Sequence, residues 1–146
     1  MEHNENDSVK LLRECDAGVQ MGVDSITDVL DDVRSDELRD FLNTCKTEHE
    51  GLRDEIQREL HARGDEGKMP NPIAKGMSKV KTGLNMAAMK SDETIAKLMT
   101  EGCEMGIESL SKYLNRYAAA DERAQKLAKK LIEAEDRLCV KMRAYL

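Results

Sequence analysis

The sequence predicts an all-α protein, an antiparallel four-helix bundle made of two similar helical hairpins. Apolar residues recur at steps of three and four along four long segments, which is the spacing of one face of an α-helix. Only two prolines and nine glycines occur in 146 residues, so long helices can run without interruption. Two of the breaks between the segments are very short, and long helices joined by short turns fold back antiparallel.

The composition is that of one globular domain, which we expect to span residues 1–146. A chain of this length can bury one substantial core. Hydrophobic residues make up 40% and charged residues 36%, which is typical of amphipathic helices and too apolar for a disordered chain. With three Tyr, one Phe and no Trp, the core must consist of aliphatic residues, Met and Ala.

Charge and hydropathy exclude several classes of protein. The net charge of −6 argues against a general nucleic-acid binder. No apolar run approaches the roughly 18 residues of a transmembrane helix, and the polar start from Met1 to Asp7 does not resemble a secretory signal. The cysteines are widely separated and form no CxxC pair. We therefore expect buried, reduced thiols in a cytoplasmic protein, with redox or metal roles as the alternative. Those cysteines are Cys15, Cys45, Cys103 and Cys139.

The first hairpin is predicted at about residues 7–63. Its first helix runs from about Asp7 to Val33, and its second ends before Gly64. Arg34 and Ser35 form the connection, with Ser35 as the N-cap of the second helix. The apolar face of the first helix carries Leu12, Cys15, Val19, Val23, Ile26 and Leu30. That of the second helix carries Leu38, Leu42, Cys45, Leu52, Ile56 and Leu60.

The second hairpin is predicted at about residues 91–146. Its first helix opens near Ser91, and a short turn from Tyr117 to Ala120 leads to its second helix. The apolar face of the first of these helices carries Ile95, Met99, Cys103, Gly106, Leu110 and Leu114. That of the second carries Leu127, Leu131, Leu138 and Met142.

A crossover at about residues 64–90 connects the hairpins. Gly64, Gly67 and Pro70 mark its irregular first part. Asn71 can cap a further short helix, and Pro72 can occupy its first turn. The apolar side of this short helix carries Ile73, Met77, Val80 and Leu84. A connection of this length can travel the full height of a bundle.

The two hairpins look like copies of each other. Residues Gly18 to Ile26 match Gly102 to Leu110 at a shift of 84 residues, with Gly-x-x-Met-Gly and a Ser in common. The second helix of each hairpin matches more weakly at a shift near 86. Because glycine costs up to about 1 kcal/mol inside a helix, the repeated glycines suggest a close approach of backbones, such as the first helix against the third.

Equal distances from the two hairpin turns place polar residues at one height. Gln20 is level with His49 in the first hairpin, and Glu104 is level with Glu135 in the second, given the fixed rise of a helix. The shift of 84 residues relates Gln20 to Glu104, and the shift of 86 residues relates His49 to Glu135. Glu48 stands beside His49 in the sequence. One polar side chain from each helix is therefore predicted to meet at a common level.

Two hairpins joined by a long crossover resemble the ferritin-like superfamily, including rubrerythrin-like bacterial members, over residues 7–146. Active di-iron members carry a Glu on the first and third helices and Glu-x-x-His on the other two. The resemblance therefore implies a metal-binding level, with Glu104 in the place of the third-helix carboxylate. This chain has Gln20 in the place of the first-helix Glu. It has no Glu-x-x-His motif, since Lys46 stands three residues before His49. These departures indicate a degenerate metal site.

Two interpretations of the polar level stay open. We favour a hydrogen-bonded network or solvent-facing flanks, with no catalytic residue. In the alternative, Glu48, His49, Glu104 and Glu135, with Gln20 in support, bind a divalent ion such as iron, manganese or zinc through oxygen and imidazole ligands.

One turn along from this level, Asp24 and Glu108 form a further pair related by the shift of 84 residues. They either widen an acidic ligand set or are exposed helix carboxylates. We favour exposure.

The segment from Gly67 to Ser91 contains lysines and methionines but no acidic residue. Its helix either covers the bundle with its apolar side, which we favour, or uses Lys75, Lys79 and Lys81 to bind an anionic membrane surface or a partner. If part of the apolar side stays exposed, homodimerisation is the expected use.

Three functional classes follow from these patterns. The leading hypothesis is a non-enzymatic, homodimeric ferritin-like protein with a degenerate metal site, acting as a structural or interaction module. The second is a divalent-metal-binding or di-iron-type oxidoreductase or storage protein. The third is an adaptor that binds an anionic surface or partner through the basic crossover helix.

Overall fold

The computed structural model describes residues 2–67 and 79–146, and these residues form helices joined by turns, without a strand. The predicted all-α class is confirmed. The α-helices are α1 (Glu2–Leu30), α2 (Asp36–Ala62), α4 (Lys79–Met86), α5 (Asp92–Arg116) and α6 (Glu122–Met142), followed by the 3-10 helix η1 (Arg143–Tyr145). None of the helices in the described ranges is long and apolar enough to cross a membrane.

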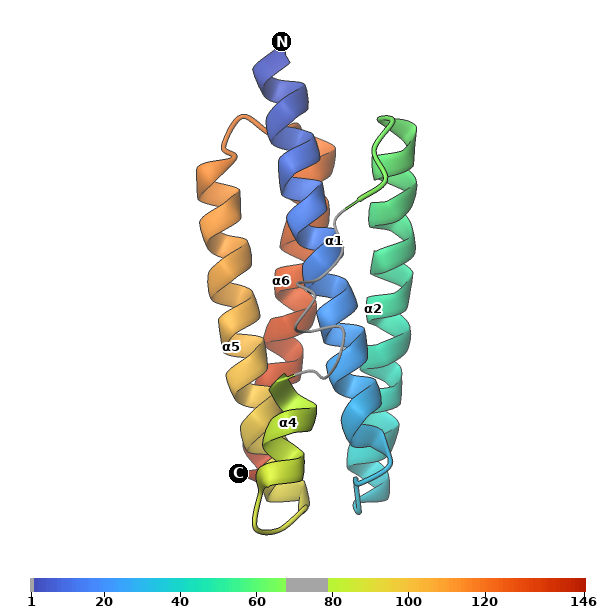
Figure 1. Ribbon diagram of the computed structural model, residues 1–146, viewed down its shortest axis with the longest axis vertical. Coiled ribbons are helices and arrows are strands. Elements are labelled where there is room, and N and C mark those ends of the chain that lie inside the picture. The colour runs from blue at the N-terminus through green and yellow to red at the C-terminus, as the bar shows by residue number, and fades with distance from the viewer. Residues whose placement is uncertain (1, 68–78) are drawn as a thin grey trace.

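The four long helices lie side by side (Figure 1). α1 descends from the N-terminus at the top and α2 returns upwards, while α5 rises and α6 descends to the C-terminus at the bottom. α1 contacts α2, α5 and α6, and α6 also contacts α2 and α5. α1 and α6 therefore lie in the middle, with α2 and α5 on opposite sides (Figure 1).

Side-chain caps begin three of the long helices. Ser35, Ser91 and Asp121 accept hydrogen bonds from backbone N–H groups three residues further on, at 3.2, 3.2 and 2.9 Å. The predicted cap at Ser35 is confirmed. α1 ends at Leu30 rather than Val33, because Asp32 and Val33 close tight turns onto the carbonyls of Val29 and Leu30. α1 also begins before the predicted Asp7, because the polar first residues continue the helix without a breaker.

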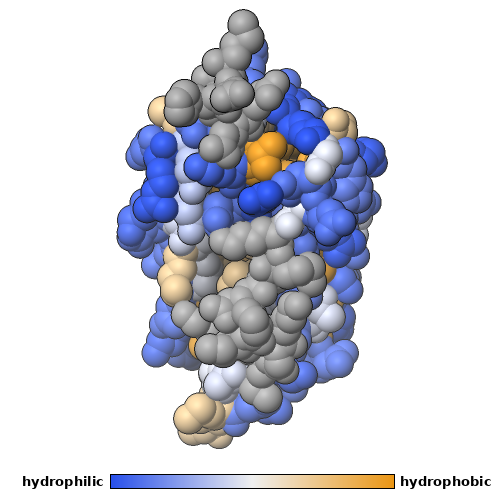
Figure 2. All heavy atoms as spheres, turned by 45° about the horizontal axis from the view of Figure 1, so that its top comes forward, coloured by the Kyte–Doolittle hydropathy of each residue, from blue (hydrophilic) through white to orange (hydrophobic). Residues whose placement is uncertain are grey.

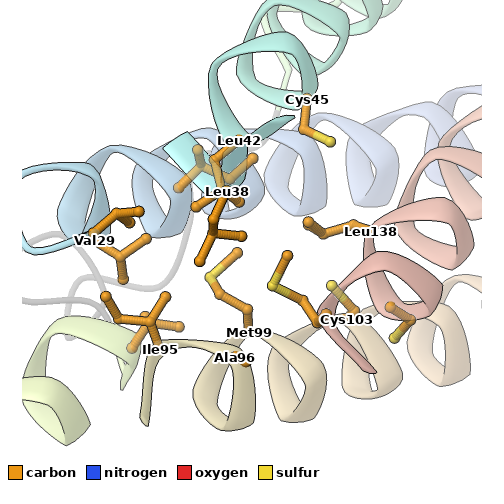
Figure 3. Packing of buried hydrophobic residues seen from close by; sticks show 14 of the residues in the cluster. Val29, Leu38, Leu42, Cys45, Ile95, Ala96, Met99, Cys103 and Leu138 are labelled. Carbon is orange, nitrogen blue, oxygen red and sulfur yellow. The ribbon is translucent and has the colours of Figure 1, made fainter. Parts of the chain in front are cut away.

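Two adjoining apolar clusters fill the space between the helices. One contains Leu38 and Leu42 of α2 with Ile95 and Met99 of α5, shown from close by in Figure 3. The other surrounds Leu131 of α6, nearer the opposite end. Most predicted stripe residues are buried, while Leu30, Gly106 and Leu114 are only partly so. All four cysteines are buried and free, as predicted. The coloured atoms of the face drawn in Figure 2 are, by contrast, mostly hydrophilic.

The crossover connects opposite ends of the molecule. After α2, Asp65 accepts hydrogen bonds from Arg13 of α1 at 3.1 and 3.0 Å, which ties the chain back onto α1. Gly67 has a φ of +90°, and a Cβ atom there would lie 2.4 Å from Asp16, so the position requires glycine. α5 then starts beside the α1–α2 turn, where Asp92 accepts from the backbone N–H groups of Arg34 and Ser35.

The described part of the predicted crossover helix is α4. Val80 and Leu84 are buried in the first cluster, and α4 packs on α1 and α5. For these residues the favoured interpretation holds, since the apolar side covers the chain's own helices. The predicted positions Asn71, Pro72, Ile73 and Met77 lie outside the described residues.

Candidate functional site: a buried polar pair

The structure brings two of the predicted polar residues together in the core. His49 of α2 and Glu135 of α6 are 0% and 8% exposed. Nε2 of His49 lies 2.8 Å from Oε1 of Glu135, and Nδ1 lies 2.8 Å from the carbonyl oxygen of Cys45. His49 therefore connects its own helix to the neighbouring hairpin.

The geometry of His49 determines how many protons the pair holds. A carbonyl oxygen only accepts, so Nδ1 must carry a proton and donate it to Cys45. A second proton must then lie between Nε2 and Glu135, because a bare ring nitrogen and a bare carboxylate would repel. Burial by itself lowers the pKa of His49, but the hydrogen bond and charge of Glu135, with Cys45 and Glu48, raise it above the usual range. The pair thus shares one proton and is satisfied within the core.

Glycines on the other two helices make room for this pair. A Cβ atom at Gly22 of α1 would lie 2.9 Å from Cδ2 of His49 and 3.3 Å from Oε1 of Glu135. A Cβ atom at Gly106 of α5 would lie 3.7 Å from Oε2 of Glu135. These equivalent glycines were expected to mark close backbones. α1 and α5 do contact each other, and Gly22 and Gly106 also face the polar side chains.

Two thiols extend the polar contacts beyond Glu135. Glu135 and Cys139 add to the effect of burial on the pKa of Cys103. Sγ of Cys139 donates to the carbonyl oxygen of Thr100 at 3.8 Å. Burial raises the pKa of Cys103 and Cys139, and it raises the pKa of Cys15 and Cys45 to about 12. All four therefore stay protonated near neutral pH, which makes them poor nucleophiles.

The other predicted ligands point elsewhere. Gln20 donates to Asp16 at 3.0 Å, Glu48 pairs with Arg137 at the surface, and Glu104 is exposed. Among the described residues, no three His, Cys, Asp or Glu side chains are arranged to hold a metal ion. The common level thus holds the His49–Glu135 pair, and the other three residues of the alternative ligand set do not join it.

The second acidic level lies at the surface. Asp24 is exposed, and Glu108 pairs with Lys112 at 3.3 Å. Partial burial and the charge of Asp28 raise the pKa of Asp24, while Arg53 opposes them. Both carboxylates have the exposure that we favoured for them.

The predicted basic surface is described only in part. Lys81 is exposed, Lys75 lies outside the described residues, and nothing is described of the side chain of Lys79. At and just beyond the end of α4, Met86 and Met89 are 82% and 69% exposed.

Sequence reasoning missed Asp16, a carboxylate only 2% exposed on α1. Its Oδ1 accepts from Gln20 at 3.0 Å and from Gln57 of α2 at 3.3 Å, and Gly67 covers it. The spacing of Asp16 and Gln20 by one helical turn was the available signal, but burial here depends on the returning crossover chain.

Equivalent contacts join the two hairpins at both ends. At one end, the N–H of the α2 cap Ser35 donates to Asp92 of α5 at 2.9 Å. At the other end, the N–H of the α6 cap Asp121 donates to Ser8 of α1 at 2.8 Å. Ser8 and Asp92 differ by 84 residues, and Ser35 and Asp121 by 86, as do His49 and Glu135. At both ends and at the centre, the contacts between the hairpins therefore join positions that are related by the same two sequence shifts.

Shallow hollows lie away from the pair. One of about 420 Å³ is lined by residues that include Glu93, Lys97 and Leu146. Another of about 380 Å³ lies between the end of α1 and α4. Neither includes His49 or Glu135.

Comparisons of the chain with protein-family models, curated proteins and solved structures give no match.

Proposed function

We propose that the chain is a duplicated, ferritin-like four-helix bundle that acts as a structural or interaction module. In this proposal the level that holds metal in active members of that superfamily has become a packing contact. The chain carries no catalytic centre at that level.

The observation that carries the proposal is the self-sufficient His49–Glu135 pair. Each partner satisfies the other, and Gly22 and Gly106 close the space around them. A metal centre would need at least one further ligand, but Glu104 is exposed and Gln20 is bonded to Asp16. Buried polar groups that satisfy one another can fix the register of packed helices.

The reciprocal contacts support the duplication. Any two amphipathic helices have the same spacing of apolar residues. Amphipathicity does not, however, require that the caps of α2 and α6 bind equivalent positions of the other hairpin. The same offsets relate the cap contacts, the polar pair and the glycines. The crossover between opposite ends is the connection that a ferritin-like layout requires.

Metal analysis tests the proposal. Elemental analysis of the purified protein should find no stoichiometric iron, manganese or zinc. Added metal should leave the melting temperature unchanged, because a ligand that binds the folded state must raise it. A raised melting temperature that disappears in His49→Gln would contradict the proposal and favour the metal-binding alternative.

A specific observation favours the adaptor as a second candidate. Met86 and Met89 are largely exposed at the end of α4, with Lys81 and Lys90 exposed nearby. Exposed methionines and lysines suit an anionic membrane, although Asp28, Asp31 and Asp32 line the same hollow as the two lysines. Sedimentation with vesicles containing anionic lipid tests it: wild type should bind, and Lys81→Glu/Lys90→Glu should bind more weakly. Equal binding by both would remove this candidate.

A further inference from the structure

The polar pair differs from the other contacts between the hairpins in one respect. A glycine faces the pair from each hairpin, and the cap contacts are alike in kind, since a backbone N–H donates to a side-chain oxygen at each end. At the central level, however, the α1–α2 hairpin presents an imidazole and the α5–α6 hairpin presents a carboxylate. The two hairpins are therefore complementary at this level and self-complementary elsewhere.

This difference matters when two copies of the chain meet. Two α1–α2 hairpins packed in the same way would place His49 against His49. Two α5–α6 hairpins would bury Glu135 against Glu135, and like groups at close range disfavour each other. Two carboxyl groups or two imidazoles can also share a proton, but only unlike hairpins place an acid against a base, so the contact favours the unlike partner over the like one.

We propose that the His49–Glu135 pair is a partner-selecting contact. It makes an α1–α2 hairpin accept an α5–α6 hairpin, either its own or that of a second copy of this chain. It disfavours pairing between like hairpins. This inference goes beyond the proposed function and does not depend on metal content.

The connection allows a hairpin from a second copy to take this place. Residues 63–67 stay on their own hairpin through the contacts with Arg13 and Asp16. The eleven residues 68–78 before α4 can reach about 36 Å, more than the roughly 20 Å across two packed helices. The same tether gives the chain's own hairpin an effective concentration of about 1 mM, so the wild type pairs with itself at lower protein concentrations.

Two single variants expose the selection. His49→Glu places two carboxyl groups at the central level, and Glu135→His places two imidazoles there. The second imidazole has space, because Gly106 stands by Glu135 as Gly22 stands by His49. When the two variants are refolded together from urea, exchanging hairpins restores two unlike pairs. If each restored pair raises the equilibrium constant for the exchanged dimer about tenfold or more, the two pairs together raise it about a hundredfold. The exchanged dimer then forms near about 10 μM protein rather than near about 1 mM.

The expected result has two parts. Native mass spectrometry of the equimolar mixture at about 20 μM should show a heterodimer of one chain of each variant. That mixture should also melt at a higher temperature than either variant alone, because the pairs are restored. This holds even if neither variant folds alone, since co-refolding forms both pairs together.

Controls separate selection from other association. His49→Glu/Glu135→His in one chain restores the pair internally and should retain the wild-type mass, as should wild type alone. A mixture of wild type with either single variant should show no gain in melting temperature. If the two single variants together melt only as they do separately, the proposal is overturned.

Discussion

The two hairpins share a framework but differ in what each places at the centre. The α1–α2 hairpin contributes His49 and the tightly packed Gly22, while the α5–α6 hairpin contributes Glu135 and the looser Gly106. At the ends, the charged Asp92 accepts two backbone N–H groups at one turn, whereas the neutral hydroxyl of Ser8 accepts from the N–H of Asp121 at the other. Corresponding positions of the two hairpins therefore contribute differently to the free energy of unfolding. Each such difference predicts that the same substitution at the two positions changes stability by different amounts.

The largest effect is expected at the pair itself. Glu135→Leu leaves the ring of His49 without its buried partner, which should lower the free energy of unfolding by about 3–5 kcal/mol. Glu133→Leu, at an exposed site on the same helix, should change it by less than about 0.5 kcal/mol. Urea denaturation of both variants measures the difference, and equal effects would contradict the buried pair.

The glycines should respond in opposite directions to the same change. Gly22→Ala inserts a Cβ atom 2.9 Å from a ring held by two hydrogen bonds. The net loss should be about 1–3 kcal/mol. Gly106→Ala makes only an ordinary contact at 3.7 Å, so its better helix propensity should add about 0.5–1 kcal/mol. The two unfolding curves should lie on either side of the wild-type curve. A loss at both positions would show that Gly106 is also crowded.

The end contacts should differ by less. Asp92→Ala removes a charged acceptor from the N–H groups of Arg34 and Ser35, at an expected cost of about 2 kcal/mol. Ser8→Ala removes one neutral acceptor from the N–H of Asp121, at about 1 kcal/mol. Thermal unfolding of both variants tests the order, and a larger loss for Ser8→Ala would reverse the comparison.

The smallest effect is the pH dependence of the pair. The pKa of His49 is raised in the folded state, so the folded protein holds this proton more tightly than the unfolded chain. Its stabilisation is complete below the unfolded pKa of about 6.5 and is lost as the pH rises through the higher folded pKa. Wild type should therefore lose more stability than His49→Gln between pH 6 and 9 in urea titrations. Parallel pH profiles would argue against the shared proton.

Most of the fold could be predicted because local patterns encode it. The apolar stripes place residues such as Leu38, Ile95 and Leu127 in the core, and Ser35 caps α2. The level of His49 and Glu135 followed from the rise of a helix. The rotation of each helix about its axis did not, which is why Glu104 is exposed and Gln20 bonds within α1.

Other features depend on tertiary contacts that no local pattern records. Asp16 is buried because the chain at Gly67 returns over α1. The sequence around Asp16 gives no sign of this burial. The glycines were expected to bring backbones together, but their repeat alone does not distinguish a neighbouring backbone from a neighbouring ring. Contacts from distant segments decide both cases.

The most direct test of this account is the coupling between His49 and Glu135, measured by a double-mutant cycle. Urea unfolding of wild type, His49→Leu, Glu135→Leu and the double variant gives the coupling free energy. Because each single change leaves a buried polar partner unsatisfied and the double change leaves none, the double variant should lose much less than the sum of the two singles. We expect a coupling of at least about 1.5 kcal/mol. A coupling near zero would contradict the central role of the pair.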